Sequence, residues 1–83
     1  PNPFNPTTKI QFDLPENEFV SINIYNLRGS KVKSLLNTSI DAGYSSIIWD
    51  ATNDLGQSVS AGMYIYTIQA GSFRQTKKMI LLK

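Results

Sequence analysis

Polar and apolar residues alternate over several short stretches of the chain. From Lys9 to Leu14 every second residue is apolar, and a similar alternation appears over residues 19–25 and 62–70. A period of two places the apolar side chains on one face, so each stretch predicts a half-buried β-strand. Prolines at positions 1, 3 and 6 exclude a helix in the preceding segment and favour extended or turn geometry.

Further strands are expected between turn signals. We predict strands over residues 31–36, 44–50 and 73–82, and a polar loop over 37–43 that could include a short strand over 39–41. Turns are expected at four places: 15–18, 26–29, 53–56 and 71–72. No stretch has a helical period. The pattern predicts an all-β fold, an immunoglobulin-like antiparallel sandwich of about seven short strands.

The expected core is centred on Trp49. Its indole is large, and the indole N–H needs a hydrogen-bond partner when it is buried. Tyr64 is expected on the inward face of its strand. The glycines at turns and strand entries are assigned structural roles, namely Gly29, Gly43, Gly56 and Gly62.

The end of the chain departs from alternation, because residues 79–82 are all apolar. A strand covered on both faces would explain this run, and so would a partner docking on one face. We expect the first arrangement.

Composition restricts the class of protein. The chain has 83 residues, 41% of them hydrophobic and 17% charged, which fits one small globular domain and neither a disordered tail nor a membrane segment. A net charge of +2 is too small an excess to indicate a nucleic-acid binder. Because the chain begins at Pro1, we expect residues 1–83 to be a single C-terminal domain of a longer protein.

Catalytic chemistry is poorly represented. The chain has no histidine and no cysteine, which removes the usual general base, the common nucleophile pairs and the preferred zinc ligands. A pair among the six carboxylates could in principle hydrolyse glycosides. However, a sandwich this small rarely leaves a substrate cleft. We therefore expect no enzyme activity, no catalytic residue and no cofactor.

One loop is a candidate for calcium. Asp50, Asn53 and Asp54 supply oxygen-bearing side chains before Gly56, and calcium prefers oxygen ligands. The spacing differs from that of an EF-hand loop. The favoured interpretation is an Asx-type turn in which Asn53 and Asp54 bind the local backbone.

Exposed aromatic rings raise the hypothesis of carbohydrate binding. Tyr25, Tyr44 and Phe73 could stack on sugars if they were exposed, as in a carbohydrate-binding or spacer module of a modular extracellular enzyme. In a small sandwich such rings more often pack in the core or across strands.

A set of short motifs carries a resemblance to a known family. In chain order they are Pro1–Thr8 with Ile10, Ile24–Gly29 with Val32 and Leu35, Ala42–Tyr44, Trp49–Ala51, Asn53–Gly56, Ala61–Tyr64 and Thr76–Lys83. Along essentially its whole length the chain resembles the C-terminal sorting domains, type A, of the type IX secretion system. Its middle portion is also similar to the immunoglobulin-like domain of flagellar hook-capping proteins, but the proline-rich opening favours the sorting family.

The resemblance implies a non-catalytic secretion signal. Such a domain directs a passenger from the periplasm through the outer membrane of a Gram-negative bacterium, to the cell surface or the medium. Its implied partners are the outer-membrane translocon, shuttle proteins and a sortase-type protease that removes the domain. We expect recognition through the last strand, by Lys77, Lys78, Met79, Leu81 and Lys83. Alternatively, these lysines only keep an exposed edge soluble.

Overall fold

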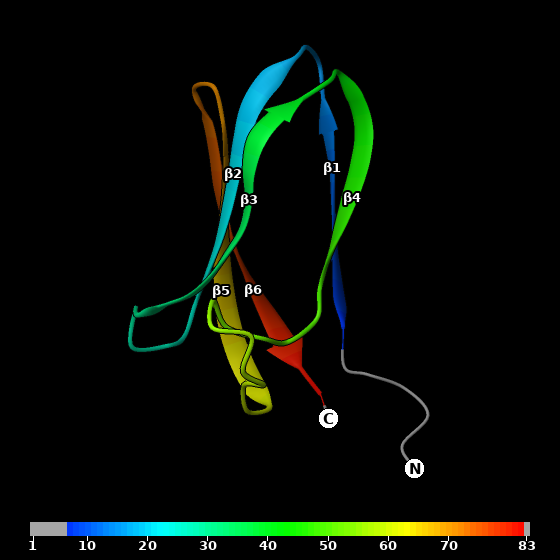
Figure 1. Cartoon of the computed structure of the whole chain (residues 1–83). Helices are drawn as coiled ribbons and strands as arrows, with labels where there is room; N and C mark the ends of the chain where they lie inside the picture. The colour runs from blue at the N-terminus through cyan, green and yellow to red at the C-terminus, as the bar shows by residue number, and fades with distance from the viewer. Residues whose placement is uncertain (1–6, 83) are drawn as a thin grey trace.

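The computed structural model describes residues 7–82. Its strands are β1 (Thr8–Leu14), β2 (Glu18–Tyr25), β3 (Lys31–Ile40), β4 (Gly43–Trp49), β5 (Gly62–Ala70) and β6 (Phe73–Leu81). β1 and β4 form a two-stranded antiparallel sheet, and a four-stranded antiparallel sheet has the order β3-β2-β5-β6. The two sheets are the two layers of a sandwich (Figure 1).

This architecture confirms the expected fold class. The described residues form six strands and no helix, where the pattern had predicted about seven strands. No helix in this part of the chain is long and apolar enough to span a membrane.

Alternation places one face of each predicted strand in the core. Val20, Ile22 and Ile24 on β2 are fully buried, and Tyr64 and Ile68 on β5 are nearly so. Because β2 and β5 are neighbours in the sheet, their inward side chains contribute to two apolar clusters against β1 and β4, and the partly buried Leu35 and Tyr66 pack against both. The buried apolar residues are Ile10, Leu14, Val20, Ile22, Ile24, Trp49, Ala51, Tyr64, Ile68, Ala70 and Leu81.

Trp49 lies at the centre of one half of this core, as predicted. Its side chain is fully buried. The indole Nε1 donates to the Thr52 carbonyl oxygen at 2.8 Å, so its polar atom is satisfied. Its ring meets Tyr64 edge-on, with 5.2 Å between the ring centroids and 72° between the planes. This T-shaped contact is a favoured arrangement for aromatic pairs.

The third strand is longer than predicted. The pattern predicts a loop over residues 37–43 with at most a short strand over 39–41, whereas β3 continues to Ile40 and pairs with β2 from Glu18 onward. Asn37, Thr38 and Ser39 are exposed on this edge strand. These three polar residues show no alternation of apolar and polar positions that would predict a strand. Their pairing with β2 is made by backbone hydrogen bonds.

The last strand is not covered on both faces, so that prediction is wrong. Leu81 is 2% exposed, whereas Ile80 is 61% and Leu82 is 78% exposed. β6 lies at the edge of its sheet, and only its inward side chains reach the core. The apolar run therefore leaves Ile80 on the surface.

Tight connections depend on left-handed backbone conformations. Gly29 has a φ of +85° in the β2–β3 turn, where the Gly29 N–H donates to the Asn26 carbonyl at 3.0 Å. Glycine adopts this conformation without the steric cost of a side chain. Gly43, Gly56 and Gly62 also have positive φ. Among the described residues Ala51 is the non-glycine residue with positive φ, at 65°, and it is fully buried.

Candidate functional site

The predicted recognition residues lie on β6, at one edge of the four-stranded sheet. Lys77 and Lys78 are exposed, Met79 is half-buried, and Leu81 belongs to the core. Lys83 lies outside the described residues. By alternation Lys78 points to the outer face of the sheet, whereas Lys77 and Met79 lie on the same face as Leu81, where Met79 packs against the core.

The structure adds an exposed apolar pair to these lysines. Ile80 on β6 and Met63 on β5 are directly opposite each other in the register, and they are 61% and 38% exposed. Lys78 lies opposite the half-buried Ile65 on the same outer face. Ile80 is not among the recognition residues predicted from the sequence. Because residues 79–82 are all apolar, the sequence does not show that Ile80 points outward.

β6 is a basic strand. The strand contains Arg74, Lys77 and Lys78 and no carboxylate, and its neighbour β5 has no charged residue. Arg74 and Lys78 point to the outer face, because they alternate with residues whose side chains face inward, such as Leu81. This edge is therefore suited to an acidic partner.

The opposite edge of the same sheet is partly covered by the chain itself. The Asp54 N–H donates to the Val32 carbonyl at 3.0 Å, and the Ser34 N–H donates to Asp54 Oδ1 at 2.9 Å. These bonds occupy backbone groups of β3 that a partner strand would need. Of the two edges of the four-stranded sheet, β6 is thus the more accessible.

The candidate calcium loop is held by internal hydrogen bonds. Asn53 Oδ1 accepts from the backbone N–H groups of Leu55 and Gln57 at 3.0 and 2.9 Å, an Asx-type arrangement as favoured from the sequence. Asp54, expected to bind the local backbone, instead binds Ser34 on β3. No group of three or more carboxylates within residues 7–82 is arranged to hold a metal ion.

Asp50, the third residue of that loop, is also engaged locally. Its Oδ1 accepts from the Thr52 hydroxyl at 2.5 Å and from the Thr52 N–H at 3.2 Å. The hydroxyl bond is the main reason that the pKa of the Asp50 carboxyl lies below its ordinary value of 3.8. Thr52 therefore stabilises the ionised carboxylate and orients it beside the turn that follows Trp49.

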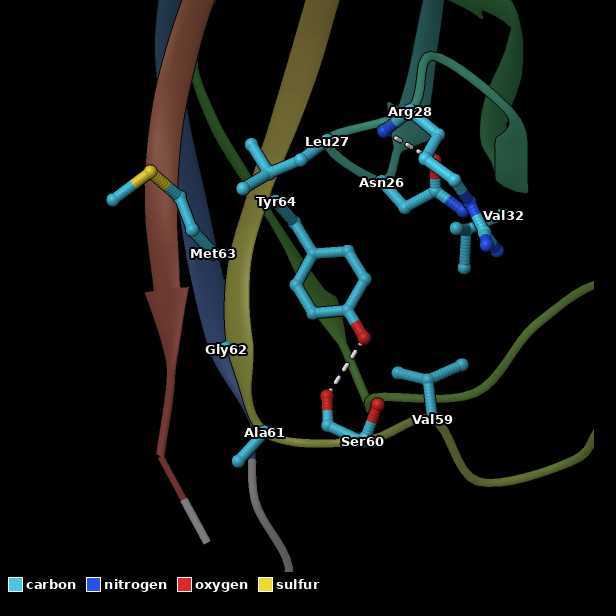
Figure 2. Close-up of a pocket in the computed structure, with 10 residues that line it drawn as sticks. All are labelled: Asn26, Leu27, Arg28, Val32, Val59, Ser60, Ala61, Gly62, Met63 and Tyr64. Carbon is cyan, nitrogen blue, oxygen red and sulfur yellow. Dashed lines mark hydrogen bonds between the residues drawn. The ribbon is translucent and has the colours of Figure 1, made fainter.

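A hollow of about 570 Å³ lies at the end of the sandwich where β5 begins. Figure 2 shows its lining, with the Tyr64 hydroxyl directed at Ser60, to whose carbonyl it donates at 2.7 Å. The lining residues are Asn26, Leu27, Arg28, Val32, Val59, Ser60, Ala61, Gly62, Met63 and Tyr64. This set contains no carboxylate, so the hollow lacks the acid pair that glycoside hydrolysis uses.

The aromatic residues considered for sugar binding do not form one platform. Tyr44 is 67% exposed on β4, in the two-stranded sheet. Tyr25 is half-buried at the end of β2, whereas Phe73 is 55% exposed at the start of β6. Val20, five residues before Tyr25, pairs with Ala70, which pairs with Phe73, so the two rings lie toward opposite ends of the large sheet.

Comparison with solved structures finds the same fold in flagellar proteins. FlgD from P. aeruginosa matches with a TM-score of 0.70 and 25% identity, covering 90% of this chain and 59% of the FlgD chain. FlgD from Xanthomonas campestris, described in connection with hook capping, matches with a TM-score of 0.71 and 26% identity. That match covers 93% of this chain and 56% of the FlgD chain. The chain thus spans less than two thirds of either FlgD chain.

The family comparison reaches along almost the whole sequence. A search of curated proteins finds no match. In contrast, the family model described as "Secretion system C-terminal sorting domain" matches residues 1–82. The matched range includes the proline-rich opening, all six strands and the basic and apolar end of β6. The chain belongs to the family of secretion system C-terminal sorting domains.

Proposed function

We propose that this chain is the non-catalytic C-terminal domain that directs a longer passenger protein through the outer membrane by the type IX secretion system, after which a sortase-type protease removes it. The family match over residues 1–82 is the observation that carries this proposal. The passenger, preceding Pro1, would then be released into the medium or held on the cell surface.

The physical properties of the domain support such a role. A small all-β sandwich with an apolar core can serve as a folded label, because recognition requires only its outer surface. The accessible and basic edge at β6 is the surface we assign to the export machinery, with Lys77, Lys78 and Met79 in contact and Leu81 as internal support. Lys83 extends the same basic series.

A reporter fusion tests the sorting function. The chain is placed after a fluorescent protein that carries a periplasmic signal, in a bacterium that possesses the type IX system. We expect the reporter to leave the periplasm, and we expect the reporter without the chain to remain there. Retention of the complete fusion in the periplasm would contradict the proposal.

Charge reversal on β6 tests the recognition surface separately. Deleting residues 77–83 would remove the proposed recognition residues together with the buried Leu81, and would therefore affect folding as well as recognition. Substitutions of the exposed lysines change recognition without removing Leu81. We expect the double variant Lys77→Glu/Lys78→Glu to reduce export strongly while its thermal melting stays close to that of the unchanged domain. The double variant Lys9→Glu/Lys31→Glu makes the same charge change on β1 and β3, also at exposed positions. Equal export of the two variants would contradict the assignment of β6.

A further inference from the structure

One side of the sandwich is open between β1 and β6. The small sheet has two strands and the large sheet four, and within residues 7–82 β1 pairs with β4 alone and β6 with β5 alone. Two hollows of about 320 and 170 Å³ lie along this side, and both are lined by Phe12, Asp13, Ile68 and Phe73. They form a single groove, which we call the β1–β6 groove.

The groove has apolar walls and an apolar floor. Phe12 of β1 forms one wall, Phe73 of β6 the other, and Ile68 of β5 lies between them. Phe73 is 55% exposed and Phe12 is half-buried, although both lie on inward faces of their strands. Apolar side chains entering between these rings would bury surface that no strand of the described chain covers.

The backbone of β6 offers a free hydrogen-bonding edge along the groove. Gly71 and Ser72 form a two-residue turn, so Ala70 and Phe73 are the hydrogen-bonded pair next to it. In an antiparallel ladder such pairs alternate with pairs whose N–H and C=O groups point away from the partner strand. The residues of β6 whose backbone groups point to the free edge are therefore Arg74, Thr76, Lys78 and Ile80.

Charge determines which kind of strand fits this edge. At one end the groove is lined by Glu16 and Glu18, and at the other by Lys77, with Lys78 next to it on the edge; Asp13 lines both hollows. A carboxylate is favoured beside the lysines and disfavoured at the other end. A second copy of this chain pairing through β6 would bring two basic, carboxylate-free strands together, which like-charge repulsion opposes.

We propose that the β1–β6 groove binds an extended segment of a partner protein, which adds as a strand to the free edge of β6. Apolar side chains at alternate positions of the segment pack between Phe12 and Phe73, and an acidic side chain lies beside Lys77 in the groove. This mode of strand addition derives affinity from main-chain hydrogen bonds and specificity from side-chain pockets. The inference rests on the proposed sorting function for the identity of the partner as a component of the export machinery.

Binding of a synthetic peptide tests the backbone contact. The probe is a fluorescein-labelled peptide of about ten residues, a typical upper strand length, with alternating Val and Thr and two Glu near one end. Its matched control has Lys in place of Glu. Fluorescence anisotropy measures binding to the folded domain, and we expect the acidic peptide to bind more tightly. No binding, or equal binding of both peptides, would overturn the proposal.

Two substitutions at Thr76 separate the edge from the side chain. Thr76→Pro removes an outward N–H, and proline is tolerated on edge strands where no ladder bond is lost. Thr76→Ala keeps that N–H, and both variants lose the 3.3 Å contact between the Thr67 and Thr76 hydroxyls. We expect Thr76→Pro to weaken peptide binding about fivefold to tenfold relative to Thr76→Ala. Equal binding by the two variants would contradict strand addition.

Two further pairs of variants test the groove and its charge without disturbing the ladder. Phe73→Ala should weaken binding, whereas Phe19→Ala should not, because Phe19 has a similar exposure of 57% but does not line the groove. Likewise, Lys77→Glu should abolish the preference for the acidic peptide, and Lys31→Glu on β3 should preserve it. Unchanged binding by Phe73→Ala and Lys77→Glu would overturn the assigned site even if Thr76→Pro failed to fold.

The reporter assay distinguishes this inference from the sorting function. Full export by the Phe73→Ala fusion, and by the Thr76→Pro fusion where that variant folds, would refute strand addition while leaving the sorting function intact. Failure of the unchanged fusion to leave the periplasm would refute the sorting function, whatever the peptide result.

Discussion

Trp49 buries more of its side chain in the core than the neighbouring Ile48 on β4 does. It is fully buried, whereas Ile48, the preceding residue, is 57% exposed. Truncation leaves a large cavity, so Trp49→Ala should lower the free energy of unfolding by about 3–5 kcal/mol. Denaturant unfolding measures this change. Ile48→Ala is the control and should cost under about 1 kcal/mol. Similar losses for both variants would contradict the assignment of the core.

Ala51 is a second critical residue, and its role depends on backbone conformation. A left-handed conformation costs an L-residue about 1–2 kcal/mol, which glycine avoids. Ala51→Gly relieves that cost but loses a buried methyl group worth about 0.8 kcal/mol, so we expect the unfolding free energy to stay within about 1 kcal/mol of the original. Ala51→Val adds a β-branched side chain in a filled site and should destabilise by more than about 2 kcal/mol. The reverse order in thermal melts would contradict this account.

The Asp50 carboxyl gives a pH dependence whose sign follows from its hydrogen bond to Thr52. Because folding lowers the pKa of Asp50 below 3.8, its ionised form stabilises the folded state above that pH. The contribution is lost as the pH falls through the lowered pKa, and it is small because the group is exposed. We expect an NMR titration of the Asp50 carboxyl to have its midpoint below 3.8, and Thr52→Val to raise that midpoint. An unchanged midpoint in the variant would assign the shift to another cause.

At the scale of strands, the sequence was most informative where one face is buried. The alternation over 9–14 and 62–70 predicted β1 and β5 within a residue of their observed ends, because inward positions are apolar and outward positions are polar. The second half of β3 could not be predicted in this way. It is an exposed edge whose pairing with β2 is made by the backbone, and backbone pairing leaves no pattern in the side chains.

The loop that follows β4 allows a direct test of the calcium hypothesis. An oxygen of each of the three candidate side chains already accepts a hydrogen bond, and one of these bonds fixes the loop to β3. Binding calcium would disrupt these contacts. We therefore expect the same melting temperature in calcium and in a chelator. A clear rise with calcium would show that the loop is a cation site.

The proposed recognition surface was predictable only in part. The positions of Lys77 and Lys78 on an exposed strand follow from their charge, which is costly to bury. For the apolar run over 79–82, in contrast, the sequence does not indicate which residues point inward. Which residues point inward is set by the hairpin register with β5, which places Leu81 in the core and Ile80 on the surface. The β1–β6 groove depends on how the two sheets pack, which no local pattern encodes.

For the whole molecule, fold alone does not identify the function. The FlgD proteins share this architecture at 25% and 26% identity. One sandwich can serve different roles because function depends on the surface and not on the core. The family match distinguishes a secretion sorting domain from a relative of the FlgD proteins, since it includes the opening segment and the basic end of β6.

The most direct test of the central claim compares two matched strains, one with a functional type IX system and one without it. Each expresses the same fluorescent protein fused to this chain, and the fraction of reporter accessible outside the outer membrane is measured in both. The account predicts that most of the reporter is outside in the first strain and inside in the second. Equal fractions in the two strains would contradict the claim that this domain directs export.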